Sequence, residues 1–238
     1  MTKTLGRSML NFRRCFLMLN GINSNEGTKV MSTKSTKFFT STAVAIGLLF
    51  QSGISSTVYA EEYFTVTDGN LARPTGYREW VFVGTPLTPN DLNDGKAAFP
   101  EHHNVYIDPG SWAHWKETGK FRDGTILMKE LVSVGSKAAV SGNGYFQGEY
   151  IGLEATIKSA ALFPDEPGNW GYYSFSTPDK KSLAETAKAF PTAACNACHA
   201  ESAADDFVFT QYYPVLRAGK GTGNEAIGGV TSELGGGE

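Results

Sequence analysis

Two cysteines and a histidine lie within five residues near the C-terminal end of this 238-residue chain, in the order Cys195-Asn196-Ala197-Cys198-His199. Thiols at this spacing can each add to one vinyl group of a haem, and the histidine that follows then lies beneath the iron. The pattern therefore predicts one covalently bound haem c. Cys195 and Cys198 would attach the macrocycle, and His199 would be the metal ligand.

Two other uses of the same motif remain open. A Cys-x-x-Cys redox pair normally lies near the start of a βαβ unit, whereas this motif is close to the C-terminus with no such unit around it. A zinc site needs four ligands. Only His102, His103 and His114 could complete that set, and their spacing does not relate them to the motif. Haem c is the favoured interpretation.

The sequence offers few residues for the second axial position of the iron. Electron-transfer cytochromes usually use Met or His there, and neither residue occurs after the motif. His102 and His103 stand in a polar stretch before an expected strand, and we expect them at the surface. His114 falls in an expected short helix as a solvated or satisfied side chain. We therefore expect an iron with an open face, which binds small molecules and acts on them.

The first 60 residues resemble an export leader. They hold seven Lys or Arg and one acid, Glu26, and residues 31–60 contain a positive start, the apolar run 43–50 and the small residues of Val58-Tyr59-Ala60. This pattern predicts a signal peptide over 31–60, cleaved after Ala60, and a periplasmic location. Residues 1–30 are interpreted as an extension from an upstream start. The apolar run is shorter than the roughly 20 residues of a spanning helix, so we expect no membrane span in the mature form.

The expected mature chain is acidic, with 14 basic and 23 acidic residues in 61–238. Nucleic acid is disfavoured as a partner, because phosphate binding needs clustered Lys and Arg. A basic protein partner remains compatible with this charge. We expect one haem-binding domain over 61–218, followed by a flexible Gly-rich tail over 219–238.

The hydrophobic pattern is mainly that of strands, expected over 79–84, 104–108, 125–134, 145–157 and 170–175. Helices are expected over 108–116, where Pro109 lies in the first turn, and over 179–190 before Pro191. The predicted fold class is α+β, a mainly antiparallel β-sheet with a few helices.

Lys129 and Glu154 are placed symmetrically about the expected turn at Ser141-Gly142. If the hairpin has no bulge, the two residues face each other on the same face of the sheet. An exposed salt bridge is the simpler interpretation of such a pair.

Several segments closely resemble the cytochrome P-460 family over about residues 75–218. They include Lys129-Glu130-Leu131-Val132-Ser133-Val134-Gly135, Tyr150-Ile151-Gly152-Leu153-Glu154 and Phe209-Thr210-Gln211-Tyr212-Tyr213-Pro214, together with 78–85, 92–97, 105–109, 121–125 and 191–193. The resemblance implies an exported, mainly β, homodimeric c-type haem enzyme. Such enzymes oxidise hydroxylamine, with nitric oxide as intermediate or product and nitrous oxide as a major product, and a soluble redox protein would accept the electrons.

The resemblance also implies roles for individual residues. Lys129 matches the lysine that forms a third covalent link to the haem, Glu154 the distal carboxylate that relays protons, and His199 the proximal ligand. Because Leu127 and Leu131 flank Lys129 on its strand face, we expect a neutral, nucleophilic amine. Two alternatives remain: a related c-type cytochrome that binds nitric oxide or carbon monoxide, and an electron-transfer cytochrome.

Overall fold

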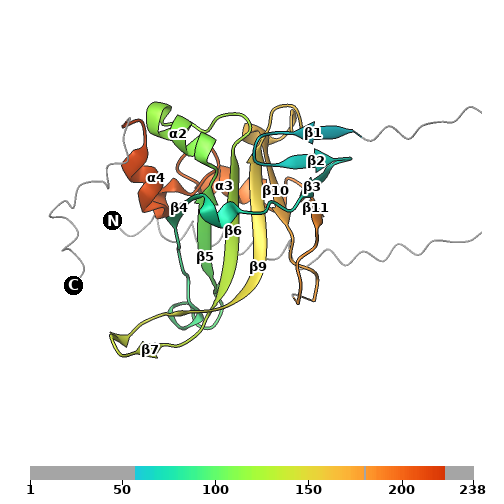
Figure 1. Cartoon of the computed structure of the whole chain (residues 1–238). Helices are drawn as coiled ribbons and strands as arrows, with labels where there is room; N and C mark the ends of the chain where they lie inside the picture. Colours follow the sequence, from blue (N-terminus) through green and yellow to red (C-terminus); the bar gives the residue numbers. More distant parts are fainter. Residues whose placement is uncertain (1–56, 180, 223–238) are drawn as a thin grey trace, which may run out of the picture.

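A five-stranded antiparallel sheet forms the centre of the molecule (Figure 1). The computed structural model describes residues 57–179 and 181–222. The strand order is β10-β9-β6-β5-β4, and the strands are β4 (Val81–Gly84), β5 (His102–Ile107), β6 (Ile126–Val134), β9 (Gln147–Lys158) and β10 (Trp170–Ser174). All the neighbouring pairs run antiparallel. The α+β prediction and the five strands expected from the sequence are confirmed.

A smaller sheet covers one face of the central sheet. It has the order β1-β2-β3-β11 and consists of β1 (Val58–Ala60), β2 (Thr65–Thr67), β3 (Asn70–Ala72) and β11 (Thr186–Lys188). Its apolar side chains pack against those of β6, β9 and β10 in one core cluster that includes Val66, Leu71, Met128, Ile157 and Phe175. Burial of this apolar surface fixes the register of the central strands on this face.

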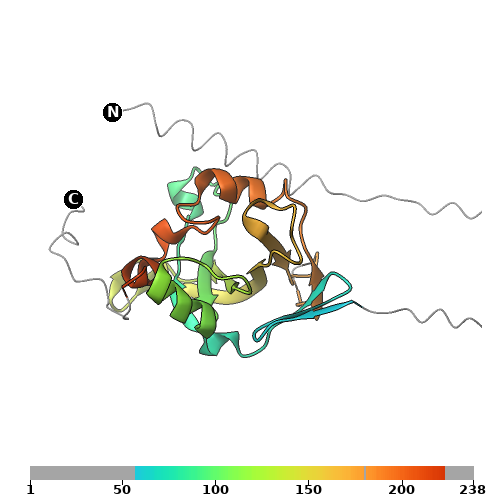
Figure 2. The ribbon, with the colours of Figure 1, turned by 90° about the horizontal axis from the view of Figure 1, so that it is seen from above.

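The helices cover the opposite face, as Figures 1 and 2 show. They are α2 (Pro109–Thr118), α3 (Asn196–Ser202) and α4 (Pro214–Gly219). The second core cluster lies here and includes Ile107, Leu127, Trp115 and Leu216. The indole N–H of Trp115 donates to the Leu216 carbonyl at 2.8 Å, which joins α2 to α4.

The sequence signals for α2 are confirmed by its ends. The Asp108 carboxylate accepts a hydrogen bond from the Ser111 N–H at 2.8 Å and caps the helix, and Pro109 occupies the first turn. Gly119 ends the helix with a φ of 68°, a conformation that glycine adopts without steric cost. No helix among the described residues is long and apolar enough to cross a membrane.

The helix expected over 179–190 is wrong. Within this range β11 pairs with β3, and Leu183 forms a bridge with Ser176. Ala187 is buried between the exposed Thr186 and Lys188, which is the alternation of a strand. Pairing with the edge of the small sheet has overridden the local helical spacing.

The hairpin that joins β6 to β9 differs in detail from the prediction. Its tip is formed by β7 (Ala138–Ala139) and β8 (Gly142–Asn143), so the turn is centred one residue earlier than expected. Two register shifts, between Leu131 and Val134, each leave one extra residue in β9. Together they compensate for the displaced turn and bring Lys129 opposite Glu154, as predicted.

The predicted segments at the two ends lie mostly outside the described residues. These are the leader over 1–60 and the tail over 219–238. β1 ends at Ala60, the predicted cleavage position, and it is the outer strand of the small sheet. Cleavage there would leave β2 as the outer strand.

Candidate functional site

His199 lies on α3, and its ring is held by a hydrogen bond to the backbone. Its Nδ1 is 2.7 Å from the carbonyl oxygen of Phe207. A carbonyl can only accept, so Nδ1 carries the proton and the lone pair of Nε2 is left available. In proteins, histidines that bind a metal through one ring nitrogen usually donate the N–H of the other ring nitrogen to such a carbonyl, which fixes the orientation of the ring. His199 is thus arranged as a ligand through Nε2.

Aromatic rings form the walls around His199. The ring of Tyr172 on β10 has its centroid 4.5 Å from that of His199, and the ring of Phe209 has its centroid 4.6 Å away. Burial outweighs the hydrogen bond to Phe207 and lowers the pKa of His199 to about 4. The imidazole is therefore neutral at neutral pH, the form that binds a metal.

A residue between the two cysteines of the motif fastens α3 to the sheet. Asn196 is buried, and its side-chain Nδ2 lies 3.1 Å from the carbonyl oxygen of Trp170 at the start of β10. The same nitrogen is 3.3 Å from the Glu166 carboxylate. Because the His199 N–H donates to the Cys195 carbonyl at 3.1 Å, both cysteines and the histidine belong to this one anchored turn.

Lys129 and Glu154 form an ion pair on the helical face of the sheet. Nζ of Lys129 lies 2.5 Å from Oε2 of Glu154, and the two residues are direct partners in the β6–β9 register. Lys129 shares its face with Leu127 and Val105, both of which belong to the helical-face core. The side chains of Lys129 and Glu154 are 28% and 31% exposed, so the pair is only partly shielded from solvent.

The expectation of a neutral Lys129 amine is wrong in this arrangement. Burial disfavours the ammonium form, but the charge of Glu154 and the hydrogen bond to it outweigh burial and raise the pKa of Lys129. The flanking leucines are therefore not the dominant environment of the amine. The residue that decides the charge comes from the neighbouring strand.

The predicted site residues converge on one region. The charges of Lys129 and Glu154 both act on the His199 imidazole, and Cys195 and Tyr213 act on Lys129. Cys195 also packs against the helical-face core. The structure therefore joins the motif on α3 to a lysine and a carboxylate from two strands.

The expectation that His102 and His103 are at the surface is wrong. β5 begins at His102 and runs between β4 and β6, so both residues lie within the central sheet. His102 is 6% exposed, and neither of its ring nitrogens has a hydrogen-bond partner among the described residues. His103 is half-buried on the face that carries Lys129, near Glu101. Extending the expected strand over 104–108 by two residues upstream would have placed both histidines in it. Glu101 belongs to no motif, and only the structure brings it next to His103.

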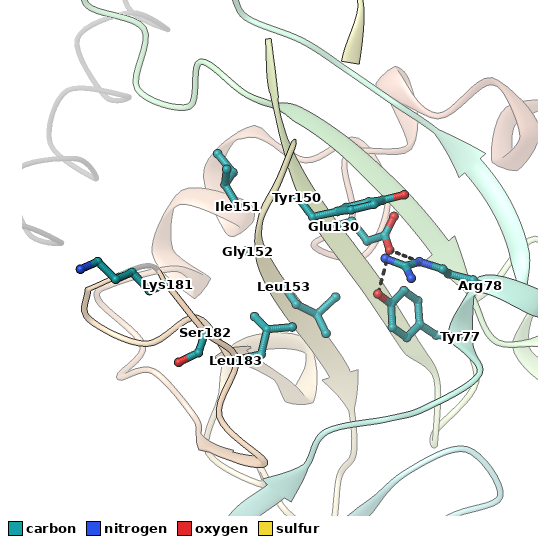
Figure 3. Close-up of a pocket in the computed structure, with 10 residues that line it drawn as sticks. All are labelled: Tyr77, Arg78, Glu130, Tyr150, Ile151, Gly152, Leu153, Lys181, Ser182 and Leu183. Atoms are coloured by element: carbon teal, nitrogen blue, oxygen red, sulfur yellow. Dashed lines mark hydrogen bonds and ion pairs between the residues drawn. The ribbon is translucent and has the colours of Figure 1, made fainter. Parts of the chain in front are cut away.

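A second cluster of ionisable residues occupies the other face of the sheet (Figure 3). Glu130 follows Lys129 on β6 but points the opposite way, is 1% exposed, and binds Arg78 at 2.5 Å and the Tyr77 hydroxyl at 2.8 Å. These side chains border a groove of about 110 Å³ that also includes Tyr150. None of the predicted site residues lines this groove. The ion pair between Arg78 and Glu130 neutralises the buried Glu130 carboxylate.

The donor set around α3 fits a haem better than a zinc ion. No cluster of three or more His, Cys, Asp or Glu side chains suited to a metal ion occurs in residues 57–179 and 181–222. One histidine with an available Nε2, two cysteines in the same turn and the aromatic walls of Tyr172 and Phe209 are instead the features that hold an iron porphyrin.

An α+β domain with this site is a haem-binding protein. The chain belongs to the cytochrome P460 family, whose model matches residues 74–210, more than half of the sequence. The matched segment contains β4 to β10, Lys129, Glu154 and the whole motif. No similar protein was found among the curated proteins. His199 would bind the iron of the haem, with Cys195 and Cys198 beside it.

Proposed function

We propose that this protein is an exported c-type haem enzyme that oxidises hydroxylamine to nitrous oxide, with nitric oxide as an intermediate. The observation that carries the proposal is the ion pair between Lys129 and Glu154, which faces the His199 turn from two neighbouring strands. An ordinary electron carrier has no use for a lysine paired with a carboxylate at this place. The alternative function is that of the related gas-binding cytochromes, and those proteins lack this lysine.

The proposed cofactor is one haem c held by four residues of the chain. Cys195 and Cys198 would form the two thioether links, and His199 would bind the iron. The nitrogen of Lys129 would form a further link by replacing the hydrogen of a meso carbon. This replacement removes two protons and two electrons, so it needs an external two-electron oxidant. When bound, the haem supplies an iron with an open face that takes up substrate and electrons. Before Lys129 can bond to carbon, its ammonium must lose a proton, and the adjacent Glu154 carboxylate can accept it.

Glu154 is also the proposed base for the substrate. Two hydroxylamine molecules that become nitrous oxide and water release four protons and four electrons. The protons need a positioned acceptor, and Glu154 lies on the helical face near His199. The electrons would pass to a soluble redox protein, and the acidic body of the chain suits a basic partner. We further propose a periplasmic homodimer.

Turnover and absorption spectra of the purified holoprotein test this function. We expect hydroxylamine oxidation with an artificial electron acceptor, nitrous oxide as product by gas chromatography, and a strongly red-shifted Soret band in the ferrous state. A protein that binds nitric oxide with an ordinary high-spin spectrum and no turnover would be a gas-binding cytochrome. A low-spin spectrum without turnover would identify an electron carrier, and either result would reject the proposal.

A further inference from the structure

Glu101 and His103 form a second ionisable pair beside Lys129, to which the reaction outlined above assigns no role. Nε2 of His103 lies 3.5 Å from Oε1 of Glu101, and the two side chains are only 16% and 15% exposed. The His103 N–H donates to the Pro86 carbonyl at 3.1 Å, which fixes the start of β5. The pair therefore occupies a defined place at the edge of the site.

The register of the sheet places this pair next to the pair of Lys129 and Glu154. Lys129 is opposite Val105 on β5, and His103 is two residues before Val105, so both side chains are on the helical face. Phe99 is close to both of them: its ring centroid is 5.9 Å from Nζ of Lys129 and 6.0 Å from the centroid of the His103 ring. The two pairs of ionisable groups therefore lie next to each other on the helical face.

His103 is suited to accept and release protons in this position. Burial, with help from the charge of Lys129, lowers its pKa below the ordinary value, while the carboxylates of Glu101 and Glu154 act in the opposite direction. The imidazole is neutral at neutral pH. Its buried Nε2 makes no hydrogen bond of good geometry within the described residues, and the 3.5 Å separation from Glu101 leaves a gap that a small shift or a water closes.

We propose that His103 and Glu101 carry the protons that Glu154 takes from hydroxylamine out to solvent. This inference rests on the proposed function of the site. The imidazole takes a proton on one ring nitrogen and releases another from Nε2 to Glu101, so its own proton count is unchanged after each transfer. Glu101 then returns the proton to water, and the electrons leave separately to the redox partner. His103 and Glu101 are relay residues, because they act on protons that Glu154 has already taken from the substrate.

Steady-state turnover of hydroxylamine by the holoprotein gives the first test. We expect His103→Gln, which keeps the shape of the side chain but cannot relay a proton, to lower kcat about 100-fold with an unchanged absorption spectrum. Added imidazole should restore part of the rate in His103→Ala, and Glu101→Gln should slow turnover less. His114→Gln on α2 is the matched control and should turn over like the wild type. A wild-type kcat for His103→Gln between pH 5 and 8 would overturn the proposal.

Cyanide binding to the ferric holoprotein separates the relay from the proposed activity. Hydrogen cyanide enters as a neutral molecule and must give its proton to a base when it binds as the anion, so stopped-flow binding reports proton transfer without hydroxylamine. We expect His103→Gln to bind cyanide about 10-fold more slowly than the wild type. If the wild type does not oxidise hydroxylamine but this slowing is observed, the relay stands and the proposed function falls. Equal cyanide-binding rates in the two proteins would overturn the relay, whatever the turnover.

Discussion

Lys129 and Glu154 are direct partners on neighbouring strands, and their charged atoms lie 2.5 Å apart on the face of the sheet that carries the His199 turn. The carboxylate keeps the lysine charged, because it raises the pKa of the amine against the effect of burial. The same carboxylate can also accept the proton that the Lys129 ammonium loses, because it lies in direct contact with it. The chemistry of the site therefore depends on the two residues together.

Replacing the lysine separates attachment of the haem from its reactivity. We expect Lys129→Ala to retain haem through Cys195 and Cys198 but to lose hydroxylamine oxidation, because the link to the macrocycle cannot form. Pyridine haemochrome spectra and turnover measure the two properties. The control is Lys137→Ala, which removes an exposed lysine paired with Asp91 at 2.7 Å on the hairpin. Full activity of Lys129→Ala would show that the lysine is not catalytic.

Replacing the carboxylate tests its role as the base. Glu154→Gln keeps the size of the side chain but accepts no proton at neutral pH, so we expect kcat to fall by roughly 10²- to 10⁴-fold. The haem should remain attached through Cys195 and Cys198, and turnover is compared on protein in which mass spectrometry shows the Lys129 link. Glu149→Gln, an exposed position on the same strand, should leave turnover unchanged. An undiminished rate for Glu154→Gln would remove this residue from the mechanism.

The cluster on the other face of the sheet makes a prediction about stability. Arg78→Ala would leave the buried Glu130 carboxylate without its cation, and we expect the free energy of unfolding to fall by about 1–3 kcal/mol. Arg73→Ala is the comparison, because its partner Glu185 is 84% exposed and the pair should contribute less than about 1 kcal/mol. Urea unfolding of the holoproteins measures both. Equal effects of the two substitutions would show that burial of Glu130 has no energetic consequence.

Buried His102 predicts a loss of stability in acid. Burial lowers its pKa below 6.5, so below that pH the unfolded chain takes up a proton that the folded protein does not. The free energy of unfolding should therefore decrease as the pH falls from 7 to 5, by at most about 1.4 kcal/mol per pH unit from this residue. His102→Leu removes this contribution, and urea unfolding at the two pH values should show a smaller decrease. The same decrease in both proteins would contradict the assignment.

Local signals predicted much of this molecule. The strands could be predicted because alternation and β-branched residues reflect burial of one face, and α2 because Asp108 and Pro109 mark its start. The motif on α3 and the pairing of Lys129 with Glu154 were also visible in sequence spacing.

What the sequence did not predict depends on contacts between distant segments. β11 is a strand only because the edge of β3 is available to it, and the region around Ala187 carries a helical spacing by itself. The charge state of Lys129 depends on a residue from another strand, and the burial of His102 depends on its place between β4 and β6. Such effects need the three-dimensional arrangement.

Mass spectrometry of proteolytic peptides from the purified holoprotein tests the central claim most directly. The account predicts that a peptide containing Lys129 and a peptide containing Cys195 and Cys198 are recovered as one species, joined through a single haem. Recovery of haem on the cysteine peptide alone, with an unmodified Lys129 peptide, would contradict it.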